Sequence, residues 1–279
     1  MRPLIERYQI SVVQSWSVYG LLKEREAEYA KLARAKNLFA MGNAVYDAST
    51  HKTASAVRMA GRGWCGANYL AESRSVGAAA ESYAMRELKW VNLPGTAQEV
   101  DAVANVFASG VDKLTDEQAS EASLQSLNRS GRLADYRYLL FSAHGYLASN
   151  PALSSIVLSL NAPTPQADGY VTAAEWPAYN FKSDLIVLSA CNTGVGATLP
   201  GEGVMGLPYA LFVAGNKNTL LTLWPVADDA TAEFMTRFFT RLRQGESQVG
   251  ALTAVKREFA QHPQWNAPRF WAAFVLYGA

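Results

Sequence analysis

The chain has 279 residues, of which 49% are hydrophobic, and its formal net charge is +1. This length and composition suit one large α/β domain and exclude wholesale disorder. The near-neutral charge, without any dense Lys/Arg run, argues against direct binding of nucleic acid.

Two cysteines, Cys65 and Cys191, are too few for a disulfide framework or a multi-thiolate zinc site, and they suit a reducing compartment. The first residues lack the apolar core of a signal peptide, and charges interrupt every long apolar run. We therefore expect a soluble cytoplasmic protein that uses no metal or other cofactor and binds no membrane.

The hydrophobic pattern of the first third predicts, in chain order, a strand at 9–15, a helix at 20–37, a strand at 37–46, a helix at 77–90 and a helix at 93–110. Small and polar residues without a sustained period predict a long insertion or loop at about 47–90 within one domain that spans residues 1–279. In the last of these helices, Thr96 and Glu99 have the spacing of a capping box.

The rest of the chain largely alternates strands and helices. Strands are predicted at 136–145, 154–160, around 170, at 183–194, 218–228 and 270–279, and helices at 116–135, 203–216, 229–245 and 247–262. The central strands are continuous apolar runs, which is typical of strands buried on both faces. The sequence therefore predicts a mostly parallel sheet between helices, with ligands beyond the carboxyl ends of its strands.

Two of the predicted strands end in chemically reactive residues. "LLFSAHG" ends in His144 and Gly145, and "LIVLSACNTG" carries Cys191. If these strands are parallel neighbours, both side chains emerge at one edge of the sheet, where an imidazole can take the proton of a thiol nucleophile. The N–H groups of Gly145 and Cys191 can then form an oxyanion hole. Each residue also has a plainer reading, because Cys191 suits a buried strand and His144 suits a local hydrogen bond.

The chain resembles the CHAT-domain cysteine peptidases, which are relatives of caspases, separases, legumains and gingipains. The matching stretches occur in the family's order and include "LPGTAQEV", "LLFSAHG", "SSIVLSL", "LIVLSACNTG", "GEGVMGLPYALFVAGN", "TLLTLWPVADDAT" and "FWAAFVLYG". The resemblance implies a caspase-like α/β/α sandwich. It also implies a dyad of His144 and Cys191, with Gly145 as the oxyanion-hole glycine and no third catalytic carboxylate.

The resemblance also points to residues that select the substrate. Ser189 and Trp224 match the walls of the specificity pocket, and Asp228 matches the separase acid that binds an arginine before the scissile bond. A carboxylate there favours Arg or Lys. The alternatives remain open: Ser189 as a small residue packed near the site, and Asp228 as an acid that the dipole of its helix stabilises. His51 and His262 are not placed at strand ends, which leaves His144 as the expected base.

The function expected from this resemblance is that of a regulated endopeptidase, which cleaves a specific protein partner through a thioester acyl-enzyme. Family members are often joined to tetratricopeptide repeats or act as effectors in bacterial defence, so a regulatory or repeat-domain partner is expected. Two alternatives stay open: a catalytically silent interaction module with a caspase-like scaffold, and another cysteine acyl-transfer enzyme such as an amidase.

Overall fold

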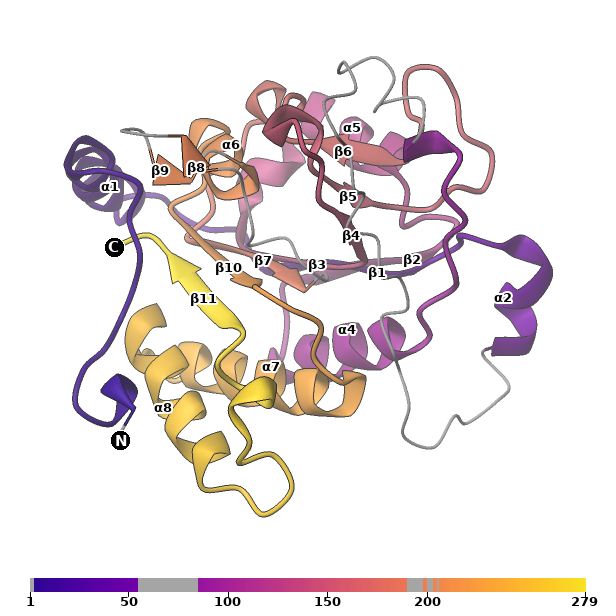
Figure 1. The fold of residues 1–279 in the computed structure, drawn as a ribbon. Helices are drawn as coiled ribbons and strands as arrows, with labels where there is room; N and C mark the ends of the chain where they lie inside the picture. The colour runs from indigo at the N-terminus through magenta and orange to yellow at the C-terminus, as the bar shows by residue number, and fades with distance from the viewer. Residues whose placement is uncertain (1–2, 55–84, 190–197, 200–202, 205) are drawn as a thin grey trace.

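A six-stranded sheet forms the centre of the computed structural model, which describes residues 3–54, 85–189, 198–199, 203–204 and 206–279 (Figure 1). The strand order is β11-β10-β7-β3-β1-β2, and each neighbouring pair is parallel except β10 with β11. These strands are β1 (Lys36–Ala44), β2 (Val111–Asp116), β3 (Tyr136–Ser142), β7 (Leu185–Ser189), β10 (Asn218–Thr222) and β11 (Phe274–Tyr277). The predicted mostly parallel sheet is confirmed.

Helices cover both faces of this sheet. On one face lie α4 (Gly95–Val106), α7 (Asp228–Arg243) and α8 (Gln248–Ala260), and on the other lie α5 (Glu121–Arg129) and α6 (Leu207–Val213) (Figure 1). The other α-helices in the described part of the chain are α1 (Trp16–Tyr29) and α2 (Ala48–Ala54). None of the helices in the described ranges is long and apolar enough to cross a membrane.

Successive side chains of the central strands point to opposite faces of the sheet, and both faces are covered, which explains why these segments are apolar throughout. In β1, Leu38 and Ala40 belong to the core under α4 and α7, whereas Phe39 and Met41 belong to the core on the opposite face. All four side chains are at most 1% exposed. A strand that is buried on both faces needs apolar residues at every position, so its sequence shows no alternating pattern.

A small antiparallel sheet lies beside α5 on the second face. It is formed by β4 (His144–Tyr146), β5 (Ser155–Val157) and β6 (Tyr170–Thr172), in the order β4-β5-β6 (Figure 1). Strand β4 follows β3 after one residue, so His144 leaves the central sheet and begins the small one. The predicted strand over 136–145 is therefore two strands.

Three of the predictions for the edges of the fold need correction. Residues 9–15 do not form a strand, because only Val12 makes a bridge, to Tyr277 of β11. Strand β2 was not predicted, since "VDKLTD" lies at a sheet edge and its residues are exposed or half-buried. Within the predicted insertion, residues 48–54 are helical (α2), and residues 55–84 lie outside the described part of the chain.

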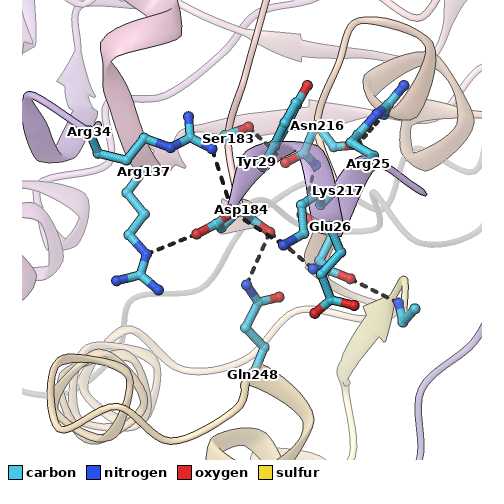
Figure 2. Close-up of polar contacts among 12 residues, drawn as sticks. Arg25, Glu26, Tyr29, Arg34, Arg137, Ser183, Asp184, Asn216, Lys217 and Gln248 are labelled. Atoms are coloured by element: carbon cyan, nitrogen blue, oxygen red, sulfur yellow. Dashed lines mark hydrogen bonds and ion pairs between the residues drawn. The ribbon is translucent and has the colours of Figure 1, made fainter. Parts of the chain in front are cut away.

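Asp184, at the amino end of β7, holds three strands and their connections together (Figure 2). Its carboxylate lies 2.9 Å from Arg137 Nε, 3.3 Å from Lys217 Nζ and 3.6 Å from an Arg34 nitrogen. Its carbonyl oxygen accepts hydrogen bonds from the side chains of Asn218 and Gln248. Arg137 lies in β3 and Lys217 immediately precedes β10, so this cluster lies at the amino edge of the sheet, opposite the carboxyl edge where ligands are expected.

Candidate active site

His144 is held in a closely packed position at the start of β4. The residue is only 4% exposed. Its ring packs against the rings of Tyr46 and Trp90, and the ring centroids are 4.7 Å apart in both pairs. Its backbone N–H donates to the Tyr46 hydroxyl over 3.1 Å, and that hydroxyl donates to the Val157 carbonyl over 2.8 Å. The backbone and the ring of His144 are thus both fixed.

The carbonyl oxygen of Val91 determines which ring nitrogen of His144 carries the proton. It lies 2.7 Å from Nε2 and can only accept a hydrogen bond, so Nε2 is the donor and Nδ1 is left with its lone pair. Burial lowers the pKa of His144 to about 4, although the hydrogen bond to Val91 opposes that shift. At neutral pH the imidazole is therefore uncharged and able to accept a proton through Nδ1.

Ser142 and Ser189 lie side by side at the carboxyl ends of β3 and β7. They are register partners, and the Ala143 N–H donates to the Ser189 carbonyl over 3.3 Å. Ser142 is two residues before His144, and Ser189 is two residues before Cys191. The predicted parallel pairing of these two strands is confirmed, whereas Cys191 itself lies outside the described residues.

Glu99 on α4 joins these two strand ends. Its Oε2 accepts a hydrogen bond of 2.5 Å from the Ser142 hydroxyl and one of 2.9 Å from the Ser189 hydroxyl. The predicted capping box is therefore wrong, because the Glu99 side chain does not turn back to the helix start. Thr96 does not cap with Glu99 either: its hydroxyl donates to the Leu93 carbonyl and accepts from the Asn43 N–H.

A small cavity of about 40 Å³ opens beside these serines. Two acidic side chains line it, Glu99 from α4 and Asp228 from the first turn of α7, and the other lining residues are Leu93, Gly95, Thr96, Ser142, Ala143, Ser189, Thr222, Val226 and Thr231. Ser189 and Asp228, which the sequence assigns to one specificity pocket, therefore line the same cavity.

Asp228 is held close to the backbone of α4. A Cβ atom added to Gly95 would lie 2.3 Å from Asp228 Oδ2, so only glycine allows this approach. The helix-capping position belongs to Ala227, and Asp228 makes no hydrogen bond or ion pair with any described residue. Burial, with the nearby charge of Asp229, raises the pKa of Asp228. The helix dipole is favourable for this acid, but it gives Asp228 no hydrogen-bond partner.

Two other predicted site residues, Trp224 and Gly145, do not line this cavity. The indole N–H of Trp224 donates to the Arg269 carbonyl over 2.9 Å, and Trp224 is not among the residues that line the cavity. Gly145 is the central residue of β4, opposite Ile156 of β5. The structure thus brings Ser189 and Asp228 together and places Trp224 against the loop before β11.

His51 lies on a helix, so the expectation that it is not at a strand end is confirmed. It lies on α2 with its Nε2 2.8 Å from Asp116 Oδ1, at the carboxyl end of β2, and it is 7% exposed. The Asn43 side chain donates to the same carboxylate oxygen. Because β1 separates β2 from β3, this His–Asp pair joins the edge strand to α2 and lies away from the end of β3 that leads to His144.

Four residues of the site were not predicted: Glu99, Tyr46, Trp90 and Val91. One signal was present in the sequence, because the same dipeptide, Ser-Ala, precedes both His144 and Cys191. These two serines occupy matching positions on parallel neighbours, and in the structure they share one hydrogen-bond acceptor. No sequence pattern identified that partner as Glu99.

The model of the CHAT domain family matches residues 1–279, the whole chain. Among curated proteins, tetratricopeptide repeat protein 28 of Mus musculus is 27% identical over 126 residues, which is 45% of this chain and 5% of that protein. The Homo sapiens protein of the same name is 27% identical over 115 residues, which is 41% of this chain and 5% of that protein. The chain thus spans a small part of the length of these relatives.

Among solved structures, two crystal structures of the Saccharomyces cerevisiae separase–securin complex are similar to this chain. The TM-scores are 0.50 at 16% identity for the 3.0 Å structure and 0.49 at 14% identity for the 2.6 Å structure. Each match covers 97% of this chain and 14% of that chain. At this identity the match with a TM-score of 0.50 shows the fold alone, and it agrees with the predicted mixed α/β architecture around a mostly parallel sheet.

Proposed function

The chain belongs to the CHAT domain family, and we propose that it is a cysteine endopeptidase with Cys191 as the nucleophile and His144 as the base. The observation that carries this proposal is the orientation of His144. Its Nε2 donates a hydrogen bond to the Val91 carbonyl, so Nδ1 is the ring nitrogen that can accept the proton of a thiol. The pairing of Ser142 with Ser189 supports it, because Cys191 follows the second strand at the same spacing at which His144 follows the first.

The proposed reaction is acyl transfer in two steps. Nδ1 of His144 takes the thiol proton as the sulfur attacks the peptide carbonyl, and the N–H groups of Gly145 and Cys191 bind the resulting oxyanion. The C–N bond then breaks and the imidazolium protonates the leaving amine, which leaves a thioester on Cys191. Water, deprotonated by the same imidazole, hydrolyses the thioester and restores the thiol.

The proposal extends to a preference for a basic residue before the scissile bond. Asp228 supports it, since its carboxylate lines the cavity beside Ser189 without a described cationic partner. A half-buried carboxylate gains a charge-assisted hydrogen bond when an Arg or Lys side chain enters. Trp224 has a supporting role in this proposal, because it holds the loop after the β10 strand through Arg269.

Regulation by another protein is also part of the proposal. The curated relatives are named for tetratricopeptide repeats, and the similar solved structures are complexes of separase with securin. We infer for this chain a regulatory protein or repeat-domain partner, within a longer chain or as a separate molecule. A role as a bacterial effector protease, acting on a chosen protein in the cytoplasm, rests on the family resemblance alone.

Cleavage of a peptide library, read by mass spectrometry, tests the proposal. Wild type and Cys65→Ala should give the same products, and Cys191→Ala and His144→Gln should give none. Cys65→Ala is the matched control, because it removes the other thiol of the chain. Cleavage that persists in Cys191→Ala would overturn the assignment of the nucleophile.

The burial of His144 favours a second candidate, a silent interaction module. A ring that is packed between Tyr46 and Trp90 in a residue only 4% exposed has little room for a substrate. If this candidate is right, neither the library nor a thiol-reactive peptide reacts at Cys191, with or without a protein partner.

A further inference from the structure

The cavity beside Ser142 and Ser189 is lined by two carboxyl groups, and no described residue supplies a cation to either of them. Glu99 is 4% exposed, and its Oε1 is buried without a hydrogen-bond partner among the described residues. Asp228 is half-buried and is likewise unpaired. Buried polar atoms are nearly always satisfied in folded proteins, so an orphaned carboxylate oxygen on a residue that lines a cavity indicates a missing donor.

The hydrogen bonds of Glu99 determine which of its oxygens is available. Both serine hydroxyls donate to Oε2, which fixes the plane of the carboxyl group and leaves Oε1 without a donor. The two acids come from different helices, α4 and α7, and the charge of Asp228 acts on Glu99. Each negative charge disfavours the ionisation of the other carboxyl group, and a cation between them would relieve this repulsion.

We propose that Glu99 and Asp228 together bind one guanidinium group, and that Glu99 makes the pocket selective for arginine over lysine. The inference rests on the proposed function in one respect, that this arginine is the substrate residue before the scissile bond. Glu99 is then a specificity-determining residue, distinct from the His144–Cys191 dyad.

The preference for arginine follows from donor geometry. A guanidinium carries five N–H donors in a rigid plane and can donate to two carboxylates from different elements at once, whereas an ammonium is a compact, strongly hydrated point charge. Citrulline has nearly the shape of arginine but no charge, so comparing the two side chains shows how much of the affinity depends on charge and how much on shape.

Peptide binding to the full chain carrying Cys191→Ala tests the inference without any catalytic step. The probes are acetyl-Ala-Ala-Ala-Xaa-amide peptides with Xaa as Arg, Lys or citrulline, and calorimetry gives Kd. We expect the Arg peptide to bind about tenfold more tightly than the Lys peptide, and the citrulline peptide to be weaker than both. Adding Glu99→Gln should weaken the Arg peptide at least tenfold and make Arg and Lys equal within about twofold.

Glu121→Gln is the matched control. Glu121 is also a buried carboxyl, 2% exposed, whose pKa burial raises to about 7, but it accepts from the Gly169 N–H and lines no part of this cavity. It should leave all three affinities unchanged. Glu99→Asp keeps the charge while retracting it by one methylene, so it should retain binding better than Glu99→Gln and lose selectivity.

The inference is overturned if the Arg peptide does not bind, or if Glu99→Gln keeps its affinity and its preference over Lys within twofold. Circular dichroism of each variant verifies that the chain is folded. These outcomes are separate from those of the proposed function: a chain that binds the Arg peptide through Glu99 but never reacts at Cys191 refutes the peptidase and leaves the pocket assignment intact.

Discussion

Ser142 and Ser189 are register partners at the carboxyl ends of β3 and β7, and both hydroxyls donate to the same oxygen of Glu99. Each serine is two residues before a residue of the proposed dyad. Glu99 therefore joins the two strand ends and is one of the residues that line the cavity beside them, and its other oxygen is buried without a hydrogen-bond partner among the described residues. The same side chain thus binds both strand ends and contributes a carboxyl group to the cavity.

The titration of His144 follows from its burial. Because desolvation lowers its pKa to about 4, the ring should stay neutral well below the usual range of histidine. A pH titration followed by NMR of the imidazole C–H signals measures this, with the His144 signal assigned by its loss in His144→Gln. We expect a midpoint near 4. A midpoint at or above 6.5 would show that the packed position is not the resting state.

Tyr46→Phe should destabilise the chain and disturb the site. The Tyr46 hydroxyl accepts from the His144 N–H and donates to the Val157 carbonyl, so its loss leaves two backbone groups without that partner. We expect the free energy of unfolding to fall by about 1–3 kcal/mol, measured by urea denaturation. The exposed Tyr8 provides the control, Tyr8→Phe, which should change stability little. Equal effects of the two substitutions would refute the bridging role of Tyr46.

Asp184→Asn should reduce stability without affecting the site. Three cations, Arg34, Arg137 and Lys217, lose their shared carboxylate, and two of them are largely buried. Removing one partner of a buried ion pair typically costs about 3–5 kcal/mol, and we expect a loss near the lower end because Asp184 is partly exposed. Asp101→Asn, which breaks an exposed pair with Lys113, should cost less than about 1 kcal/mol.

Asp184 lies at the amino edge of the sheet and the cavity lies at the carboxyl edge. Peptide affinity of the folded Asp184→Asn chain should therefore equal that of its parent. A large loss of peptide affinity in the folded variant would contradict the separation of the two edges.

The pH dependence of stability should report on Glu99. Burial raises the pKa of Glu99 from 4.5 to about 7, with the charge of Asp228 adding to the shift. The folded chain therefore holds a proton that the unfolded chain releases between pH 4.5 and 7, so this contribution to stability is lost as the pH rises through that window. As the pH rises from 4.5 to 7.5, the free energy of unfolding of Glu99→Gln should increase by about 2–3 kcal/mol relative to that of wild type. If the free energy of unfolding of wild type and of Glu99→Gln depended on pH in the same way, the raised pKa of Glu99 would be contradicted.

The sequence was sufficient for the central sheet because burial on both faces leaves an unmistakable apolar run in β1, β3 and β7. It was insufficient at the edges. Strand β2 is half-exposed and its residues alternate poorly, whereas residues 9–15 have the composition of a strand but pair only at Val12. Edge pairing depends on which segment lies nearest in the folded chain, and local composition carries little of that information.

The strand-end position of His144 and the joint lining of one cavity by Ser189 and Asp228 were predictable from spacing and family resemblance. The role of Glu99 was not, because a capping box with Thr96 satisfied the local pattern. The hydrogen bonds that Glu99 actually makes are to residues 43 and 90 positions away in the chain. The contacts of Val91 and Trp90 with His144 are equally remote in sequence, and only the folded chain reveals them.

Covalent labelling with an acetyl-peptidyl-arginine chloromethyl ketone, read by intact mass and peptide mapping, tests the central claim most directly. We predict one adduct per chain, on Cys191, that forms equally in wild type and Cys65→Ala and is absent in Cys191→Ala. The adduct should form much more slowly in His144→Gln. An adduct on Cys65 alone, or no difference between wild type and Cys191→Ala, would contradict the proposed dyad.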